Sequence, residues 1–229
     1  GMASNCVIGY VADKLVDLGA TVIFGETTEF IGGEHLLARR AVSKEVGDKI
    51  LKIVDDMELR AKSLGCDMRK GQPTPGNIEG GLSSIEEKSL GAIMKSGSKP
   101  IQGVLGYTER VTDQKGLWIK DTPGREPEIL TGMAATGAQV MMFSTGRGAP
   151  QGFPSMPVIK ICGNPNTYER MEEDMDINAG RIITGEKTIE EVGEEAFAKL
   201  IRTLSGEMTK NEAIQYITSI DIQCLGPVI

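Results

Sequence analysis

The chain has 229 residues and a mass of 24.6 kDa, which suits one large domain or two small ones. Its 32 acidic and 25 basic residues give a net charge of −7, which argues against nucleic acid as a main partner. No apolar run approaches the roughly 18 residues of a membrane span, and no basic segment precedes an apolar stretch at the N-terminus. We therefore expect a cytoplasmic globular protein with no membrane partner.

Helices and short apolar strands are predicted to alternate along the first two thirds of the chain. Helical spacing is found at 7–20, 43–65, 83–97 and 127–138, and short apolar runs predict strands at 21–24, 117–120, 139–143 and 157–161. The last third is predicted to be mainly helical, at 167–176, 188–206 and 209–220. Ser43, either Ser83 or Ser84, and Thr188 are expected to cap helix N-termini with their hydroxyls.

This alternation predicts an α/β fold with a three-layer, mainly parallel, Rossmann-like sheet and helices on both faces. We expect one domain over residues 1–229, with the four strands mutually parallel. Gly1 before Met2 is interpreted as a residue left by tag removal. The four cysteines are far apart and form no CxxC or Cys/His cluster, so free thiols are expected rather than a zinc site.

Small polar residues follow each predicted strand. They are Glu26, Asp121, Thr145 and Asn164. In parallel sheets, ligands bind beyond the carboxyl ends of the strands. Any loop in such a fold carries polar turn residues, but the agreement of four strand ends favours one shared edge lined with ligand-binding groups.

The stretch FSTGRGAPQG at 143–152 is the most distinctive of these strand ends. Glycine lets the backbone approach a ligand closely, and the forked donors of arginine match a carboxylate or a phosphate. The candidate substrate-binding residues here are Thr145, Gly146, Arg147, Gly148 and Asn164. The alternative interpretation is an ordinary turn that carries an exposed arginine.

Two common kinds of site find no support in the sequence. No GxGxxG follows a first strand and no GxxxxGK[ST] occurs, so nucleotide binding is not indicated. No serine lies in a GxSxG elbow, and His35 is the only histidine, so serine hydrolysis is poorly supported. His35 beside Glu34 is often a surface pair. Together with Glu26 and Glu29, these residues could instead hold a divalent cation.

Five segments resemble the C-terminal region of the altronate/galactarate dehydratase family. They are GETTEFIGGEHLLARRA, PGNIEGGLSSIEEKSLGAIMKSGSKPI, FSTGRGAPQG, PVIKICGN and MEEDMDINAGRI. The large subunit of (2R)-sulfolactate sulfo-lyase is similar. The resemblance implies a lyase of sugar-acid catabolism that removes water from an aldonic or aldaric acid, such as altronate or galactarate, to give a 2-keto-3-deoxy acid.

The resemblance also implies a divalent metal, Fe²⁺ or Mn²⁺, and a further N-terminal portion that this chain lacks. We therefore expect the C-terminal part of a longer enzyme, or one subunit of a split enzyme, in a homo-oligomer. An N-terminal domain or small subunit would be its partner and would hold most of the metal ligands. The alternative is a non-catalytic structural or dimerisation domain of such a lyase, or of a sulfo-lyase.

Dehydration beside a carboxylate needs a base to take the α-proton and an acid to assist departure of the β-hydroxyl. Lys160 is the candidate base, because desolvation within its strand would lower its pKa. Glu87 and Lys88 are further catalytic candidates, and Asn77 is a candidate for binding the substrate hydroxyls. The alternative is that Glu87 and Lys88 are solvated charges on a helix.

Overall fold

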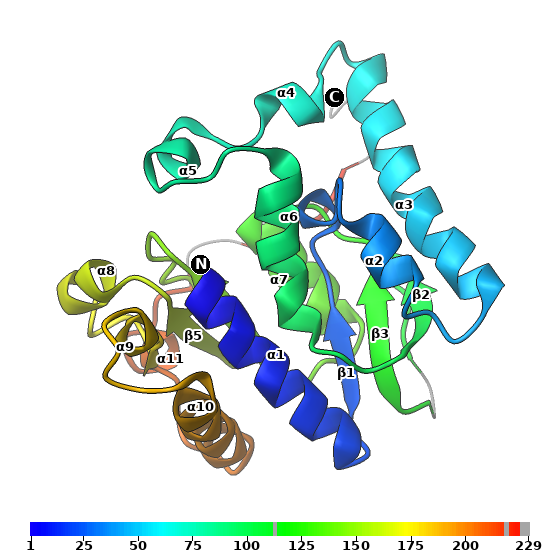
Figure 1. The fold of residues 1–229 in the computed structure, drawn as a ribbon. Coiled ribbons are helices and arrows are strands. Elements are labelled where there is room, and N and C mark those ends of the chain that lie inside the picture. Colours follow the sequence, from blue (N-terminus) through cyan, green and yellow to red (C-terminus); the bar gives the residue numbers. More distant parts are fainter. Residues whose placement is uncertain (112–113, 218–219, 225–229) are drawn as a thin grey trace.

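The strands of this protein form two small parallel sheets. The computed structural model describes residues 1–111, 114–217 and 220–224 (Figure 1). In one sheet the strand order is β1-β3-β2, and in the other it is β4-β5-β6. The strands are β1 Thr21–Phe24, β2 Ile101–Leu105, β3 Gly116–Lys120, β4 Met141–Thr145, β5 Val158–Cys162 and β6 Ile177–Asn178. All hydrogen-bonded neighbours in both sheets are parallel.

Helices surround both sheets. The α-helices are α1 Met2–Asp17, α2 Glu34–Ala38, α3 Lys44–Ser63, α4 Met68–Gly71, α5 Pro75–Glu79, α6 Ile85–Ile93, α7 Glu126–Ala135, α8 Pro165–Arg170, α9 Gly180–Ile183, α10 Ile189–Leu204 and α11 Lys210–Ala213. Two short 3₁₀ helices are η1 Thr27–Glu29 and η2 Met94–Ser96. As predicted, the hydroxyls of Ser43, Ser84 and Thr188 accept backbone N–H groups at the starts of α3, α6 and α10.

The predicted α/β class and the parallel pairing of strands are confirmed, but the single sheet is not. The strands at 21–24 and 117–120 pair in the first sheet, and those at 139–143 and 157–161 pair in the second. Within each sheet, main-chain hydrogen bonds fix the register, whereas β1 and β4 do not pair with each other. The four strands therefore do not share one hydrogen-bonded sheet.

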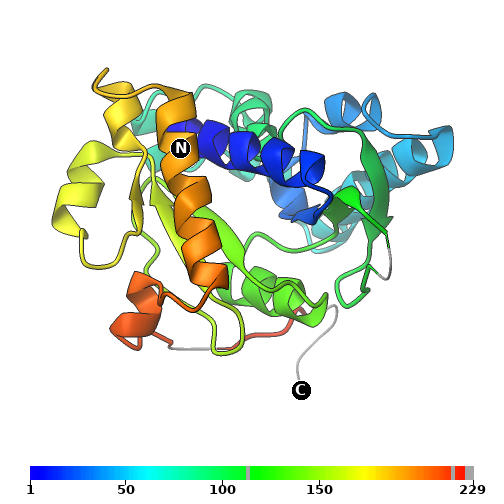
Figure 2. The same cartoon turned by 90° about the horizontal axis from the view of Figure 1, so that it is seen from below.

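Two helices lie across the boundary between the sheets. Helix α1 contacts both β1 and β4. Helix α7 lies on the opposite side of the strands from α1 (Figure 2). Its residues Ile129 and Met133 belong to a buried cluster on which Ile23 of β1 and Phe143 of β4 both pack. Burial of such side chains contributes about 1.5–3 kcal/mol each, so these two helices join the halves of the domain.

Two predicted helices are shorter in the structure. The helix expected at 167–176 ends at Arg170, because the Asp176 carboxylate instead accepts the backbone N–H groups of Lys160 and Lys210, at 2.9 and 3.1 Å. The helix expected at 209–220 is confined to α11, and its residues 218–219 lie outside the described part of the chain. All four cysteines are free. Within the described residues, no helix has the length and apolar character needed to cross a bilayer.

Candidate functional site

The polar residues that follow the strands lie at the carboxyl ends of two separate sheets, rather than along the one shared edge that the sequence predicts. In the first sheet, the Thr27 hydroxyl donates to Asp121 Oδ1 at 2.7 Å, which ties the end of β1 to the end of β3. The Glu26 N–H also donates to the Thr122 hydroxyl at 2.6 Å. In the second sheet, the Gly163 N–H donates to the Thr145 carbonyl at 2.9 Å. These bonds fix where each strand end presents its side chains.

A cluster of two carboxylates and one lysine lies at the end of β1. Lys95 Nζ is 2.5 Å from Glu29 Oε2 and 3.3 Å from Glu26 Oε2. We call these three residues the carboxylate–lysine cluster. Their side chains are largely buried, with 13% of Lys95, 21% of Glu26 and 18% of Glu29 exposed. A buried charge needs a partner, and one ammonium group here serves two carboxylates.

The two carboxylates differ in acidity because Lys95 is closer to one of them. Burial, together with the negative charge of Glu29, raises the pKa of Glu26 to about 8. Burial also acts to raise the pKa of Glu29, but Lys95 outweighs it, and the pKa of Glu29 is lowered. In the same way, burial acts to lower the pKa of Lys95, but the two carboxylates hold it above its ordinary value. At neutral pH, Glu26 therefore carries a proton beside an ionised Glu29.

The backbone at Glu26 is strained. Its φ is +81°, in the left-handed region that non-glycine residues rarely adopt. Such a conformation costs on the order of 1–3 kcal/mol and is concentrated at functional sites. Here it turns the chain out of β1 and directs the Glu26 carboxylate to Lys95 of η2.

The contacts around this cluster extend to residues from distant parts of the sequence. Lys88 is half-buried within electrostatic reach of Glu29, and its Nζ donates to Gln72 Oε1 at 3.0 Å. A few residues further on, Gly76 packs against the guanidinium of Arg147, and a Cβ added there would lie 1.2 Å from Arg147 Nη2. The structure therefore brings the start of α5 together with the loop after β4.

The loop after β4 carries an exposed arginine, and hydrogen bonds hold the backbone on both sides of it. The Gly148 N–H donates to the Thr145 hydroxyl at 3.0 Å, and the Thr167 hydroxyl donates to the Gly146 carbonyl at 3.0 Å. Gly148 has a φ of +88°, a conformation that favours glycine. Arg147 is exposed and has no carboxylate partner among the described residues. Its guanidinium is therefore free to bind an anion.

Three predicted site residues have local partners. Asn164 Oδ1 accepts the N–H groups of Asn166 and Thr167 at the start of α8. Asn77 Oδ1 accepts the N–H and the hydroxyl of Thr74 at the start of α5, at 3.3 and 2.9 Å. Glu87 is exposed, and its Oε2 accepts the N–H and the hydroxyl of Ser83, at 2.8 and 2.6 Å. All three side chains form hydrogen bonds at helix N-termini, and their roles as site residues stay predictions.

Lys160 lies within the second sheet, in the middle of β5. Its side chain is 0% exposed, forms an ion pair with Glu126 at the start of α7, and lies 4.2 Å from the ring centre of Phe143. Burial lowers its pKa, although Glu126 acts in the opposite direction. Its role as a base stays a prediction, and the structure places it behind the strand ends.

The residues considered as metal ligands do not form a metal centre here. Glu26 is bound by Lys95, His35 is exposed, and Glu34 Oε1 lies 3.9 Å from Arg69 Nη2. The other oxygen of Glu34 is buried without a hydrogen bond, but a single oxygen does not make a site. In the described parts of the chain, no three His, Cys, Asp or Glu side chains are arranged to hold a metal ion. These residues therefore do not fit a metal, and we derive no step through one.

Sequence reasoning missed Lys95, the residue that holds the cluster together. It lies inside a quoted motif, in the segment AIMKSGS, where a single lysine follows an apolar helix end. Lys120 was missed as well: it is 0% exposed at the end of β3, and its Nζ donates to the carbonyls of Gly106 and Glu109 at 3.0 and 3.2 Å. Burial lowers the pKa of Lys120 to about 8. In both cases, a lysine next to apolar residues was the available signal.

Comparison with known proteins gives a consistent result. The family model described as D-galactarate/altronate dehydratase, C-terminal, matches residues 1–224. Galactarate dehydratase (L-threo-forming) of Escherichia coli (strain K12) is 42% identical over 207 residues, which cover 90% of this chain and 39% of that protein. The beta subunit of (2R)-sulfolactate sulfo-lyase from Chromohalobacter salexigens is 38% identical over 216 residues, covering 93% and 55%.

Altronate dehydratase of Bacillus subtilis (strain 168) is 33% identical over 212 residues, which cover 93% of this chain and 42% of that protein. The chain thus spans 39–55% of the length of these three relatives. The family match covers both sheets and every residue of the carboxylate–lysine cluster. The chain belongs to the D-galactarate/altronate dehydratase family and corresponds to its C-terminal domain.

Proposed function

We propose that this chain is the C-terminal domain of a hydro-lyase that removes water from an aldonic or aldaric sugar acid to give a 2-keto-3-deoxy acid. The dehydratases among its relatives support the substrate class. The observation that carries the proposal is the carboxylate–lysine cluster, in which two neighbouring carboxylates are given opposite pKa shifts. Such divergent pairs are typical of groups that transfer protons in catalysis.

In this reaction the α-carbon loses a proton, the β-hydroxyl leaves as water, and the resulting enol becomes a ketone. We assign Glu26 as the acid that protonates the departing hydroxyl, because a carboxyl with a pKa of about 8 holds its proton at neutral pH. Glu29 and Lys95 act as positioning residues that keep Glu26 in this state. Lys160, the candidate base, is fully buried, and half-buried Lys88, a further catalytic candidate, is better placed to meet a substrate and to act as the base in its stead.

Arg147 supplies the anchor for the substrate carboxylate. Its guanidinium is exposed, unpaired among the described residues, and held against Gly76. A forked pair of hydrogen bonds to a carboxylate fixes both its position and its orientation. The same geometry suits a sulfonate, and the 38% identity to a sulfo-lyase subunit makes a carbon–sulfur lyase the second candidate function.

The test is Glu26→Gln in the full-length enzyme, which keeps the shape of the side chain but removes its proton-transfer capacity. We expect kcat to fall by about 10²–10⁴-fold with KM little changed, as for the loss of a general acid. Glu190→Gln is the matched control, because Glu190 is an exposed glutamate in the first turn of α10. Galactarate, altronate and sulfolactate are assayed in parallel to separate the two candidate functions.

If the Glu26→Gln enzyme had the kcat of the wild type for every substrate that the wild type turns over, the assignment of Glu26 as the acid would be contradicted. If Arg147→Ala also left turnover unchanged, this domain would be a structural part of the lyase, and the chemistry would lie elsewhere in the enzyme. Turnover of sulfolactate alone would favour the carbon–sulfur lyase.

A further inference from the structure

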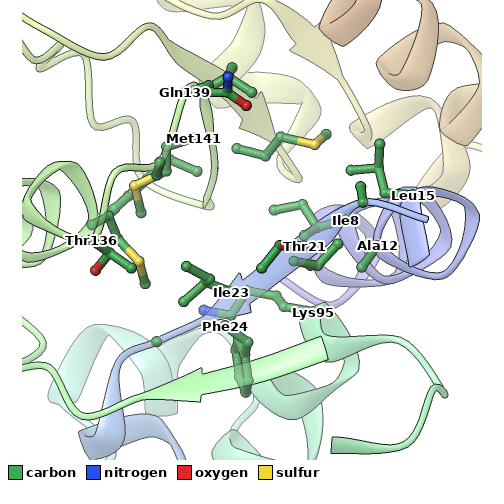
Figure 3. A pocket seen from close by; sticks show the side chains of 18 of the residues that line it. Ile8, Ala12, Leu15, Thr21, Ile23, Phe24, Lys95, Thr136, Gln139 and Met141 are labelled. Atoms are coloured by element: carbon green, nitrogen blue, oxygen red, sulfur yellow. The ribbon is translucent and has the colours of Figure 1, made fainter. Parts of the chain in front are cut away.

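A cleft separates the two sheets. It has a volume of about 460 Å³ and lies between β1, at the edge of the first sheet, and β4, at the edge of the second. Figure 3 shows Ile23 on the β1 side of this cleft and Met141 on the β4 side. Its lining is mainly apolar, with Glu26, Lys95 and Ser144 at the end where the strands finish and further polar side chains from Thr21, Lys115, Thr136 and Gln139.

Unpaired main-chain groups face this cleft from both strands. Residues in a parallel strand direct their N–H and C=O groups alternately to one neighbour and to the other. The Ala20 carbonyl accepts the Gly116 N–H, so Val22 is directed toward β3 and Ile23 toward the cleft. On β4, the Met141 N–H donates to the Pro157 carbonyl, so Met142 is directed toward the cleft.

No strand in the described parts of the chain pairs with either of these edges. An unpaired backbone polar group in an apolar setting is costly, and nearly all such groups in native structures have a partner. The two facing edges are only partly buried and present main-chain groups that an extended segment, with its own N–H and C=O groups, would satisfy.

Helices already cover both faces of the cleft. Ile8, Ala12 and Leu15 of α1 line it from one side, and Ile129 and Met133 of α7 line it from the other. Figure 2 shows these two helices on opposite sides of the strands. The outer layers of a three-layer arrangement are thus in place, and the middle layer is interrupted between β1 and β4.

The chemistry of the cleft selects among possible occupants. A sugar acid could hydrogen-bond to the polar groups at the strand ends, but it would leave most of the two strand edges unpaired and turn part of its polar surface toward apolar side chains. A small apolar molecule would leave the edges of β1 and β4 unpaired. An extended peptide with apolar side chains on both faces meets both needs, as in the addition of a strand to a sheet.

We propose that a strand from the part of the enzyme that precedes α1 fills this cleft and joins the two sheets into one parallel sheet of seven strands. The order would be β2-β3-β1-new-β4-β5-β6. The occupant is a segment of the same enzyme, because the relatives are about twice as long as this chain and the family match is to their C-terminal part. The inference does not depend on the reaction proposed above.

The position of α1 supports this segment over others. Gly1, just before α1, lies at the carboxyl ends of the strands, since its amino nitrogen is 3.6 Å from the place of a Cβ on Gly146 and 3.4 Å from one on Gly163. Helix α1 then runs across β1 and β4 and leads into β1. A strand that ends just before α1 and lies beside β1 makes α1 the crossover helix of a parallel β-α-β unit.

Hydrogen exchange of single amides in the full-length enzyme tests the proposal, with neighbouring residues as internal controls. Val22 and Phe143 direct their amides into the existing sheets, and Ile23 and Met142 direct theirs into the cleft. We expect the cleft-facing amides to exchange within about tenfold of the controls. Exchange at Ile23 and Met142 about a thousandfold faster than at the controls would overturn the proposal.

A variant with two introduced cysteines tests whether β1 and β4 pair directly with each other. Ile23→Cys/Met141→Cys places two thiols on the same side of the strands, facing α7. With a strand between them, their Cα atoms lie about two strand spacings apart, roughly 9.5 Å, which is too far for a disulfide. We expect no cross-link under oxidation, and formation of the disulfide would overturn the proposal. Protection of Ile23 that is lost on dilution would also overturn it, because the strand would then come from a second copy.

Discussion

Replacement of Glu26 by glutamine should remove a specific pH dependence from the stability of the enzyme. Burial and the charge of Glu29 raise the pKa of Glu26 from its ordinary value of 4.5 to about 8. A carboxyl whose pKa rises on folding binds its proton more tightly in the folded state. Its contribution to the free energy of unfolding is therefore full below about pH 4.5, declines as the pH rises, and is lost above about pH 8.

The size of this effect follows from the two pKa values. The difference between 8 and 4.5, at about 1.4 kcal/mol for each pKa unit, corresponds to about 5 kcal/mol at most. Because 21% of the side chain is exposed, water screens part of this, and a measured effect of about 2–5 kcal/mol is expected. Glutamine stands in for the protonated acid and does not ionise.

Urea unfolding of wild-type and Glu26→Gln enzyme at several values between pH 5 and pH 9 measures the difference. The two proteins should be similarly stable at pH 5, and the variant should become the more stable one as the pH approaches 9. The Glu190→Gln enzyme, altered at an exposed site, should follow the wild type throughout. A difference between wild type and Glu26→Gln that is the same at pH 5 and pH 9 would refute the assigned pKa and its origin in burial.

Three further predictions concern the substrate anchor and a helix cap. Arg147→Ala in the full-length enzyme should lower kcat/KM by about 10- to 150-fold. Arg147→Lys should restore only part of the loss, because an ammonium group cannot form the forked contact. Steady-state kinetics measures both variants, with the fold checked by circular dichroism. Gly76→Ala should lower kcat/KM in the same direction, because its Cβ would lie 1.2 Å from Arg147 Nη2, whereas Gly71→Ala, with nothing within 4 Å, should be silent. Glu87→Ala should lower the melting temperature through loss of the hydrogen bonds from Ser83 and leave kcat unchanged, and a large fall in kcat would return Glu87 to the catalytic residues.

Local patterns in the sequence were sufficient for most helices and for four of the strands, but not for the two-residue strand β6 or for β2. That strand, IQGVL, contains a polar residue and a glycine, which weaken any strand pattern. In the structure, Gly103 lies against the indole of Trp118, where a Cβ would be 2.3 Å from the ring. The glycine fits a contact with the neighbouring strand, and a contact of this kind cannot be read from local sequence. The division into two sheets was missed for the same reason, since main-chain pairing between distant segments leaves no local pattern.

The sequence indicated the strand ends and the loop around the candidate site, but not the carboxylate–lysine cluster. The strand ends and the loop with Arg147 could be located because glycine and small polar residues after an apolar run are a local signal, and their role in binding stays a prediction. The pairing of Lys95 with Glu26 joins residues 69 positions apart, and no single segment contains it. Asn77 and Asn164 form hydrogen bonds at helix N-termini, which the sequence did not indicate, because the residue types that bind ligands also cap helices. Their roles in substrate binding stay predictions.

The energetics of the carboxylate–lysine cluster argue for a functional role more than for a structural one. Glycine at position 26 would relieve the left-handed backbone at no steric cost. Apolar side chains in place of a buried ion pair are often neutral or stabilising, by about 1–4 kcal/mol. The chain instead places two carboxylates on one ammonium group, with one carboxyl left protonated at neutral pH. A fold that needed only stability has simpler solutions at this position, whereas proton transfer at the end of a strand requires such a group.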